Sequence, residues 1–272
     1  MTYARTVEEV FAEHTRWASI VKERHAKEAI CEYGNSKERT KRLKIGYLSP
    51  DLCTHTVALY SEVLLKHRDK ERYHITVYFC REREDEDAGR LGSYVDKWVN
   101  VFGLGAGEAA KMIHSDGIDI LVELTGHTAN NRWASIPLGV ANLQSHASSM
   151  HAPTPYNKHR SFSRLDILAC RPAPIQVTWI GYPNTTGLDY IHYRVTDALT
   201  DPIDTDQPFA EKLIRLPDNF LCFIPHPATP EVQPPPFEAN GWVTFGSFNS
   251  LGKVQVNSIL FSTNVAVINA FR

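Results

Sequence analysis

Residues 43–80, LKIGYLSPDLCTHTVALYSEVLLKHRDKERYHITVYFC, decide the fold of this 272-residue chain. The run begins and ends with short segments rich in β-branched and aromatic residues, and residues 56–66 between them have the apolar spacing of a helix. Two further β-rich segments, 97–102 and 117–124, enclose a helical pattern at 108–115. Strands that alternate with helices of this length predict an α/β fold with a Rossmann-like, doubly wound parallel sheet.

The residues before the sheet predict an amphipathic helix. Apolar residues recur at three- and four-residue spacings from residue 6 to about residue 30, and Thr6 with Glu9 has the pattern of a capping box. The helix could pack on its own domain or on a segment further upstream. The polar run 36–44 predicts a linker rather than a localisation signal, so residues 1–42 form the first expected segment.

The composition argues against several classes of protein. With 29 basic and 31 acidic residues, the chain lacks the positive field that holds a phosphate backbone, so we expect no nucleic-acid partner. The five cysteines include no C-x-x-C pair and the twelve histidines no H-x-x-x-H pair, so a metal site would need ligands from distant positions, and we expect none. The chain also lacks a signal peptide and a run of roughly 18 apolar residues, which favours a soluble, cytoplasmic or nuclear protein without a membrane partner.

A glycine-rich run, GLGAG at residues 103–107, follows one predicted strand and opens a helix. It lacks the full G-x-G-x-x-G spacing, and no acidic residue ends a second strand at the distance that a dinucleotide site requires. We therefore interpret it as a tight strand-to-helix turn.

The stretch RPAPIQVTWIGYPNTTG, residues 171–187, combines a stiff Pro-x-Pro entry, a short strand and a glycine-bounded loop. The glycines permit close approach of the backbone to a ligand, and the threonines supply hydroxyl groups. A tight structural turn would explain the glycines and the proline but not Tyr182, so we favour a loop that faces a ligand. The substrate-binding residues predicted in this loop are Gly181, Tyr182, Pro183, Thr185 and Thr186.

Two histidines follow predicted strands at their carboxyl ends, where open α/β sheets place their ligand crevice. His55 precedes a helical pattern and His127 follows the strand at 117–124. An imidazole there could orient or help deprotonate a substrate hydroxyl. Alternatively, His55 caps the helix and His127 satisfies a turn. Polar side chains beside His127 suit sugar hydroxyls or a peptide backbone, unless they cap a helix: Thr128, Asn130 and Asn131.

Three motifs together resemble the catalytic region of the protein O-GlcNAc transferase family, most closely its SPINDLY branch. They are SPD followed by His55, GHTANNR at residues 126–132, and residues 171–187. The resemblance covers about residues 43–253 and implies the amino-terminal half of a GT-B glycosyltransferase. On this basis residues 43–240 form the Rossmann-like catalytic domain, residues 241–272 begin a truncated second domain, and His55 and His127 are catalytic.

The resemblance also implies an activity. The family transfers N-acetylglucosamine from UDP-N-acetylglucosamine to Ser/Thr of nuclear and cytosolic proteins, with inversion, without a metal and with no cofactor besides the nucleotide-sugar substrate. SPINDLY-like members can use GDP-fucose, so protein O-fucosyltransfer is an alternative. A tetratricopeptide array precedes the catalytic region in the family and would lie outside this chain.

Without the second domain, we expect the chain to be inactive by itself. The rival hypotheses are a non-catalytic binding fragment or degenerate gene product and, less favoured, a nucleotide-sugar epimerase, whose catalytic carboxylates we cannot place. Residues 133–165 are predicted to be a disordered insertion of roughly 30 residues, which could equally be a functional loop or an error in the gene model.

Overall fold

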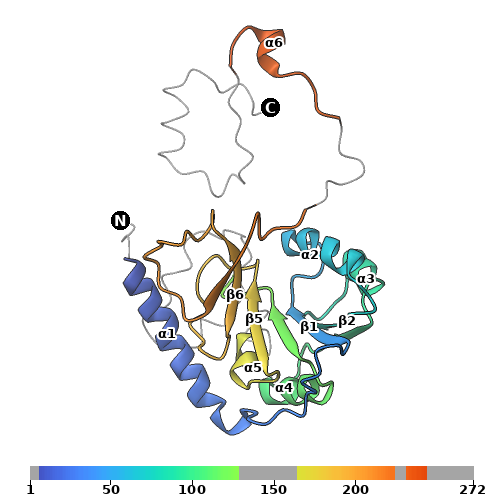
Figure 1. Ribbon diagram of the computed structural model, residues 1–272, viewed down its shortest axis with the longest axis vertical. Coiled ribbons are helices and arrows are strands. Elements are labelled where there is room, and N and C mark those ends of the chain that lie inside the picture. The colour runs from blue at the N-terminus through green and yellow to red at the C-terminus, as the bar shows by residue number, and fades with distance from the viewer. Residues whose placement is uncertain (1–5, 129–163, 224–230, 244–272) are drawn as a thin grey trace, which may run out of the picture. The chain divides into compact units, whose positions relative to one another are not determined.

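The computed structural model describes residues 6–128, 164–223 and 231–243 of the chain. Residues 1–140 with 157–224 form one unit and the remaining residues form a second. Among the described residues of the first unit, seven parallel strands make one sheet in the order β3-β2-β1-β4-β5-β6-β7 (Figure 1). The strands are β1 (Leu43–Ser49), β2 (Tyr73–Phe79), β3 (Lys97–Asn100), β4 (Ile120–Glu123), β5 (Ile175–Trp179), β6 (Tyr193–Asp197) and β7 (Lys212–Leu216).

The helices of the first unit connect and cover these strands. They are α1 (Val7–Arg24), the short 3-10 helix η1 (Ala26–Glu28), α2 (Thr56–His67), α3 (Glu86–Gly92), α4 (Ala106–Ser115) and α5 (Leu165–Ala169). The described part of the second unit holds α6 (Pro236–Asn240), which has a proline in its first turn and ends at the left-handed Gly241. In the part of the chain that the structure describes, no helix is long and apolar enough to cross a membrane.

The observed elements confirm the predicted α/β fold with a doubly wound parallel sheet. The sequence predicts four strands before residue 125, at 43–49, 73–80, 97–102 and 117–124, and each begins and ends within three residues of the observed strand. The glycine-rich run at 103–107 forms the predicted turn, because α4 begins at Ala106 with Gly105 as its N-cap. The predicted insertion at 133–165 lies outside the described residues except for its end, where Arg164 is buried and Leu165 begins α5.

Side chains that alternate along the strands form two hydrophobic cores, one on each face of the sheet. On one face, Ile75, Val77 and Phe79 pack with residues of α2 and α3. On the opposite face, Leu48 and Tyr78 pack with residues of α1, α4 and α5. Helices therefore cover both faces, as the continuous apolar runs of the central strands require.

The chain reverses its direction of travel across the sheet between β1 and β4. From β1 it moves outward through β2 to β3, then returns to β4 on the other side of β1 and continues to β7. In open α/β sheets, such a switch point leaves a crevice at the carboxyl ends of the two central strands, where ligands bind. The segments that follow β1 and β4 are therefore the first place to look for a functional site.

Helix α1 packs on the sheet of its own unit, which decides between the two alternatives that the sequence left open. Its capping box is present, since the Thr6 hydroxyl accepts from the Glu9 amide and the Glu9 carboxylate accepts from the Thr6 amide. Trp17 and Val21 are buried in the core that contains α4 and α5. The helix is thus an integral part of this domain.

We expect Gly181→Ala to lower the free energy of unfolding by about 3 kcal/mol or more, the upper end of the cost of overpacking. A Cβ atom at Gly181 would lie 1.8 Å from the carbonyl oxygen of Leu124, and backbone cannot move aside as a side-chain tip can. Gly89→Ala is the matched control, because Gly89 is in a helix with open space around it and should change stability by no more than about 1 kcal/mol. Urea denaturation of both variants measures the difference, and equal stabilities would contradict the close approach.

Candidate functional site

Three segments meet at the carboxyl edge of the sheet: the β1 loop (50–55), the β4 loop (124–128) and the β5 loop (181–187). Thr125 joins the first two, since its hydroxyl donates to Oδ2 of Asp51 at 3.0 Å and lies 3.2 Å from the hydroxyl of Ser49. Burial raises the pKa of Asp51, while the nearby charges of His55 and Arg81 oppose that rise. Asp51 and Arg81 were not singled out from the sequence.

His55 is exposed and caps α2, which is the structural alternative considered for this residue. Its Nδ1 accepts a hydrogen bond from the backbone amide of Val57 at 3.2 Å. Because Nδ1 is the acceptor, a neutral His55 carries its hydrogen on Nε2. In this tautomer, the exposed nitrogen is a hydrogen-bond donor that can orient an oxygen atom but cannot take its proton.

His127 is buried and neutral. Its Nε2 lies 2.8 Å from the carbonyl oxygen of Thr186, an acceptor, so Nε2 is the donor in this bond. Burial lowers the pKa of His127 to about 3. The ring packs edge-on against Trp17 and His14 of α1, with centroid distances of 4.5 and 5.0 Å. At neutral pH, His127 is therefore a fixed hydrogen-bonding group rather than a proton carrier.

His14 and Tyr182 join α1 to the β5 loop. His14 is fully buried, and its Nδ1 donates to the carbonyl oxygen of Val10 at 2.7 Å. Its Nε2 therefore accepts from the Tyr182 hydroxyl, 2.8 Å away. Burial lowers the pKa of His14 and raises that of Tyr182 to about 12, so both side chains stay neutral at physiological pH.

Sequence reasoning missed His14 as a site residue, although a signal was present. On the apolar stripe of α1, His14 falls four residues after Val10 and three before Trp17, where another apolar side chain is expected. A histidine at such a position needs buried partners, and here they come from the β5 loop.

The threonines of the β5 loop bind a buried carboxylate. The hydroxyl of Thr185 donates to Glu211 at 2.7 Å, and both the backbone amide and the hydroxyl of Thr186 donate to the other carboxylate oxygen. Both threonines are fully buried, whereas Tyr182 and Gly181 are half-buried and Pro183 is exposed. The hydroxyls of Thr185 and Thr186 thus stabilise the conformation of the β5 loop. A contact of either hydroxyl with a substrate remains a prediction.

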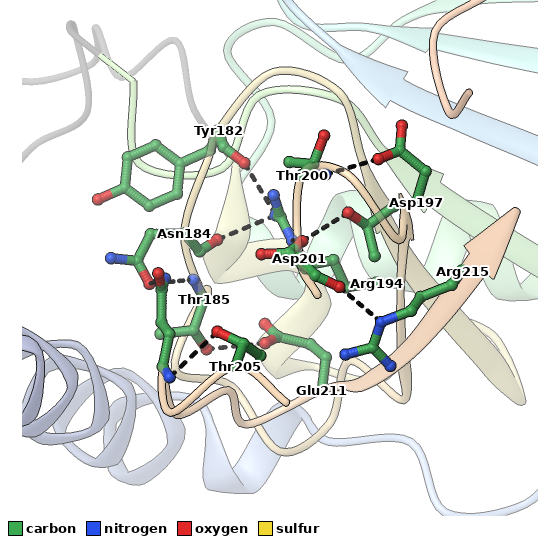
Figure 2. A network of polar contacts seen from close by, with 12 residues as sticks. Tyr182, Asn184, Thr185, Arg194, Asp197, Thr200, Asp201, Thr205, Glu211 and Arg215 are labelled. Atoms are coloured by element: carbon green, nitrogen blue, oxygen red, sulfur yellow. Dashed lines mark hydrogen bonds and ion pairs between the residues drawn. The ribbon is translucent and has the colours of Figure 1, made fainter. Parts of the chain in front are cut away.

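Arg194 of β6 supports the same loop (Figure 2). Its Nη1 donates to the carbonyl oxygens of Tyr182 at 2.8 Å and of Asn184 at 3.1 Å. Its Nε lies 3.7 Å from the carboxylate of Asp201, whose own carbonyl oxygen accepts from Arg215 at 2.6 Å. Figure 2 shows the guanidinium of Arg194 directed at the carbonyl oxygens of Tyr182 and Asn184, and Arg215 hydrogen-bonded to Asp201.

Glu123, the last residue of β4, fixes the β4 loop. Its carboxylate accepts from the backbone amides of Thr125 at 3.0 Å and Gly126 at 2.7 Å, and from the hydroxyl of Thr178 on β5. Gly126 has a φ of 54°, and a Cβ atom there would lie 2.3 Å from Cβ of Tyr182. The β4 and β5 loops therefore touch at a point where only glycine fits.

The structure brings only part of the predicted site together. His127 contacts both Tyr182 and Thr186. His55 is linked to this group only through Asp51, with which it interacts electrostatically and which binds Thr125 of the β4 loop. The hydroxyl of Thr128 donates to the carbonyl oxygen of Thr125 at 2.9 Å, so it closes the β4 loop. Asn130 and Asn131 lie outside the described residues.

A cavity of about 470 Å³ lies at the opposite, amino-terminal edge of the sheet. Asn35 and Lys41 both bind Asp119 in its wall, at 2.7 and 2.5 Å. These contacts tie the segment before β1 to the segment before β4. The cavity therefore has a structural explanation and does not belong to the site.

Comparison with known proteins identifies the family. The model of glycosyltransferase family 41 matches residues 12–145 and 136–226, which together include the three loops. The chain belongs to glycosyltransferase family 41. This confirms the resemblance that the sequence motifs indicated.

Named relatives in family 41 include plant SPINDLY proteins. The chain is 40% identical over 251 residues to a protein of Arabidopsis thaliana and 41% identical over 226 residues to one of Petunia hybrida, covering 91% and 82% of this chain. Both carry the name probable UDP-N-acetylglucosamine-peptide N-acetylglucosaminyltransferase SPINDLY. The matches take in only 24% and 21% of those proteins, so the chain spans about a quarter of their length.

A solved structure supports the architecture. The O-GlcNAc transferase of Thermobaculum terrenum, in its K341M mutant, matches 97% of this chain with a TM-score of 0.73 and 26% sequence identity. The match includes 44% of that chain. The α/β sheet therefore corresponds to part of the catalytic fold of a family 41 enzyme, as predicted.

The buried His127 predicts a specific pH dependence. Between the ordinary pKa of 6.5 and its folded value of about 3, the unfolded chain binds a proton that the folded chain does not. Stability therefore falls as the pH falls through this window, by up to about 1.4 kcal/mol per pH unit from this residue. We expect His127→Gln, which keeps a donor for Thr186, to show a shallower loss between pH 6 and pH 4.

Denaturant unfolding at several pH values measures this slope. His67→Gln is the control, because His67 is exposed at the end of α2 and should leave the slope unchanged. Equal slopes for wild type and His127→Gln would mean that the folded chain protonates His127 as readily as the unfolded chain.

Proposed function

We propose that this chain supplies the amino-terminal half of the catalytic unit of a protein O-glycosyltransferase. The proposed reaction moves N-acetylglucosamine from UDP-N-acetylglucosamine to Ser or Thr hydroxyls of intracellular proteins, with inversion and without a metal. The observation that carries it is that the family match includes the polar site at the switch point of the sheet. We infer a cytoplasmic or nuclear location from the SPINDLY relatives and these acceptors.

The proposed reaction requires the site to position an acceptor hydroxyl against the anomeric carbon of the donor sugar. In an inverting transfer, the acceptor oxygen bonds to the anomeric carbon while the bond to the diphosphate breaks, and the hydroxyl proton passes to the departing diphosphate or to solvent. His55 is proposed to donate its Nε2 hydrogen to an oxygen of the acceptor or the sugar, because its Nδ1 is occupied by the α2 cap. Its role would then be to orient the reactants.

His127 is proposed to shape the site rather than to move a proton. Its low pKa keeps the ring neutral, and its bond to the Thr186 carbonyl holds the β5 loop against the β4 loop. The residues proposed to line the substrate side of the site come from the β5 loop and from the β4 loop with the residues that follow it. They are Gly181, Tyr182, Pro183, Thr128, Asn130 and Asn131.

The identity of the donor sugar is a separate hypothesis. The names of the relatives favour UDP-N-acetylglucosamine. GDP-fucose is the alternative donor that the SPINDLY likeness suggests. Because the chain spans about a quarter of those relatives, we propose that it has no turnover alone and serves as one part of the catalytic unit.

A chimaera tests the proposal. Residues 6–223, which include α1, would replace the matching segment of the Arabidopsis SPINDLY relative, and transfer from each labelled donor to a Ser/Thr peptide would be measured. We expect N-acetylglucosamine transfer, and a decrease of about 100-fold in kcat/KM in His55→Ala, the cost of removing one hydrogen-bond donor from an active site. His55→Asn should lose as much, because asparagine caps a helix well but lacks the Nε2 donor.

His67→Ala at the other end of α2 is the control and should stay within about twofold of the unmodified chimaera, as surface changes away from a site do. Full activity in His55→Asn would reduce His55 to a helix cap. Transfer of fucose alone would replace the proposed donor, and a folded chimaera without activity on either donor would favour the binding-only alternative.

A further inference from the structure

Nitrogen, oxygen and sulfur ligands meet where the end of α1 packs on α5. A ring nitrogen of His25, a carboxylate oxygen of Glu28 and Sγ of Cys170 all lie within 4.8 Å of one another. His25 is the C-cap of α1, about 16 Å along the helix from His14 at a rise of 1.5 Å per residue. The group is therefore separate from the polar site at the carboxyl edge of the sheet.

We propose that these three side chains form a binding site for a divalent metal ion of the zinc type. Imidazole and thiolate ligands favour zinc over magnesium or calcium. Two ligands in tetrahedral coordination to zinc are separated by about 3.5 Å, given bonds of about 2.0–2.3 Å. The carboxylate oxygen of Glu28 lies 2.6 Å from Nδ1 of His25 and 3.8 Å from Sγ of Cys170, so small side-chain movements suffice.

The backbone already holds the three ligands in place. The backbone amide of Glu28 donates to the carbonyl oxygen of His25 at 2.9 Å. The backbone amide of Ile30 donates to the carbonyl oxygen of Cys170, also at 2.9 Å. The carboxylate of Glu28 lies over Gly107, where a Cβ atom would come within 2.6 Å of its Cδ. This glycine is in the first turn of α4 and makes room for the carboxylate.

Without a metal, hydrogen bonds account for the group. Nδ1 of His25 donates to Glu28, and the thiol of Cys170 donates weakly to Glu28 and to the carbonyl oxygen of Asp166 at 3.5 Å. On binding, the thiol proton leaves to solvent, the imidazole hydrogen moves to Nε2, and bonds to sulfur, nitrogen and oxygen form. One proton is released per ion, and water fills the fourth position.

Such an ion would clamp α1 to α5. The two segments are joined in the fold mainly by apolar packing, and His25 and Cys170 are far apart in the sequence. This distance explains why ligand spacing gave no hint of the site and why we expected no protein-bound metal. The clamp is structural, and the transfer reaction does not depend on it for chemistry.

Cobalt titration of the complete reduced chain tests the site, since Co²⁺ takes zinc ligands and gives a charge-transfer band with thiolate. We expect one Co²⁺ per chain, a thiolate band that zinc abolishes, and a rise in the melting temperature on metal binding. Cys170→Ser should lose the band, and His25→Ala and Glu28→Gln should each weaken cobalt binding by about tenfold or more.

The matched control is Cys31→Ser, which removes an exposed cysteine outside the group and should bind as wild type does. His25→Ala and Glu28→Gln are decisive if Cys170→Ser fails to fold, because both side chains are partly exposed and circular dichroism reports whether each variant is folded. The absence of a thiolate band in the wild type, its survival in folded Cys170→Ser, or unchanged affinity in both other variants would each overturn the proposal.

Discussion

The burial of the Glu123 carboxylate is the constraint on which the site depends. A buried carboxyl group at the end of a central strand is costly unless it is hydrogen-bonded. Burial raises the pKa of Glu123, and hydrogen bonds from two amides of the β4 loop and from the hydroxyl of Thr178 oppose that rise. Those bonds decide where the β4 loop turns. They therefore decide where His127 lies and how close the β4 loop comes to Tyr182.

Glu211, in the segment before β7, fixes the conformation of the β5 loop. It binds both threonines of the loop, while Arg194 binds the backbone on the other side of the turn. The loops at the carboxyl edge are thus shaped by buried carboxyl and guanidinium groups rather than by their own turn sequences alone. Each loop needs a distant residue to hold its form, which suits a preorganised site.

Local patterns predicted β1 to β5, because alternation and strand-helix spacing are properties of neighbouring residues, but they did not predict β6 and β7. They also placed His55 and His127 at strand ends, which parallel strands bring to one edge. They could not show that Thr185 and Thr186 meet Glu211, some 25 residues later, or that Tyr182 meets His14, 168 residues earlier. The tautomers of the histidines depend on these same partners, so the chemistry of each ring could not be predicted from spacing.

The contact between His14 and Tyr182 determines where the amino-terminal boundary of this domain lies. A chain trimmed to begin at β1 would retain every described strand and the β1, β4 and β5 loops, and would lose α1 and η1. It would therefore open one wall of the site, because α1 supplies the groups that cover His127 and the hydroxyl of Tyr182. The boundary of the functional unit therefore lies before α1 and not at the first strand.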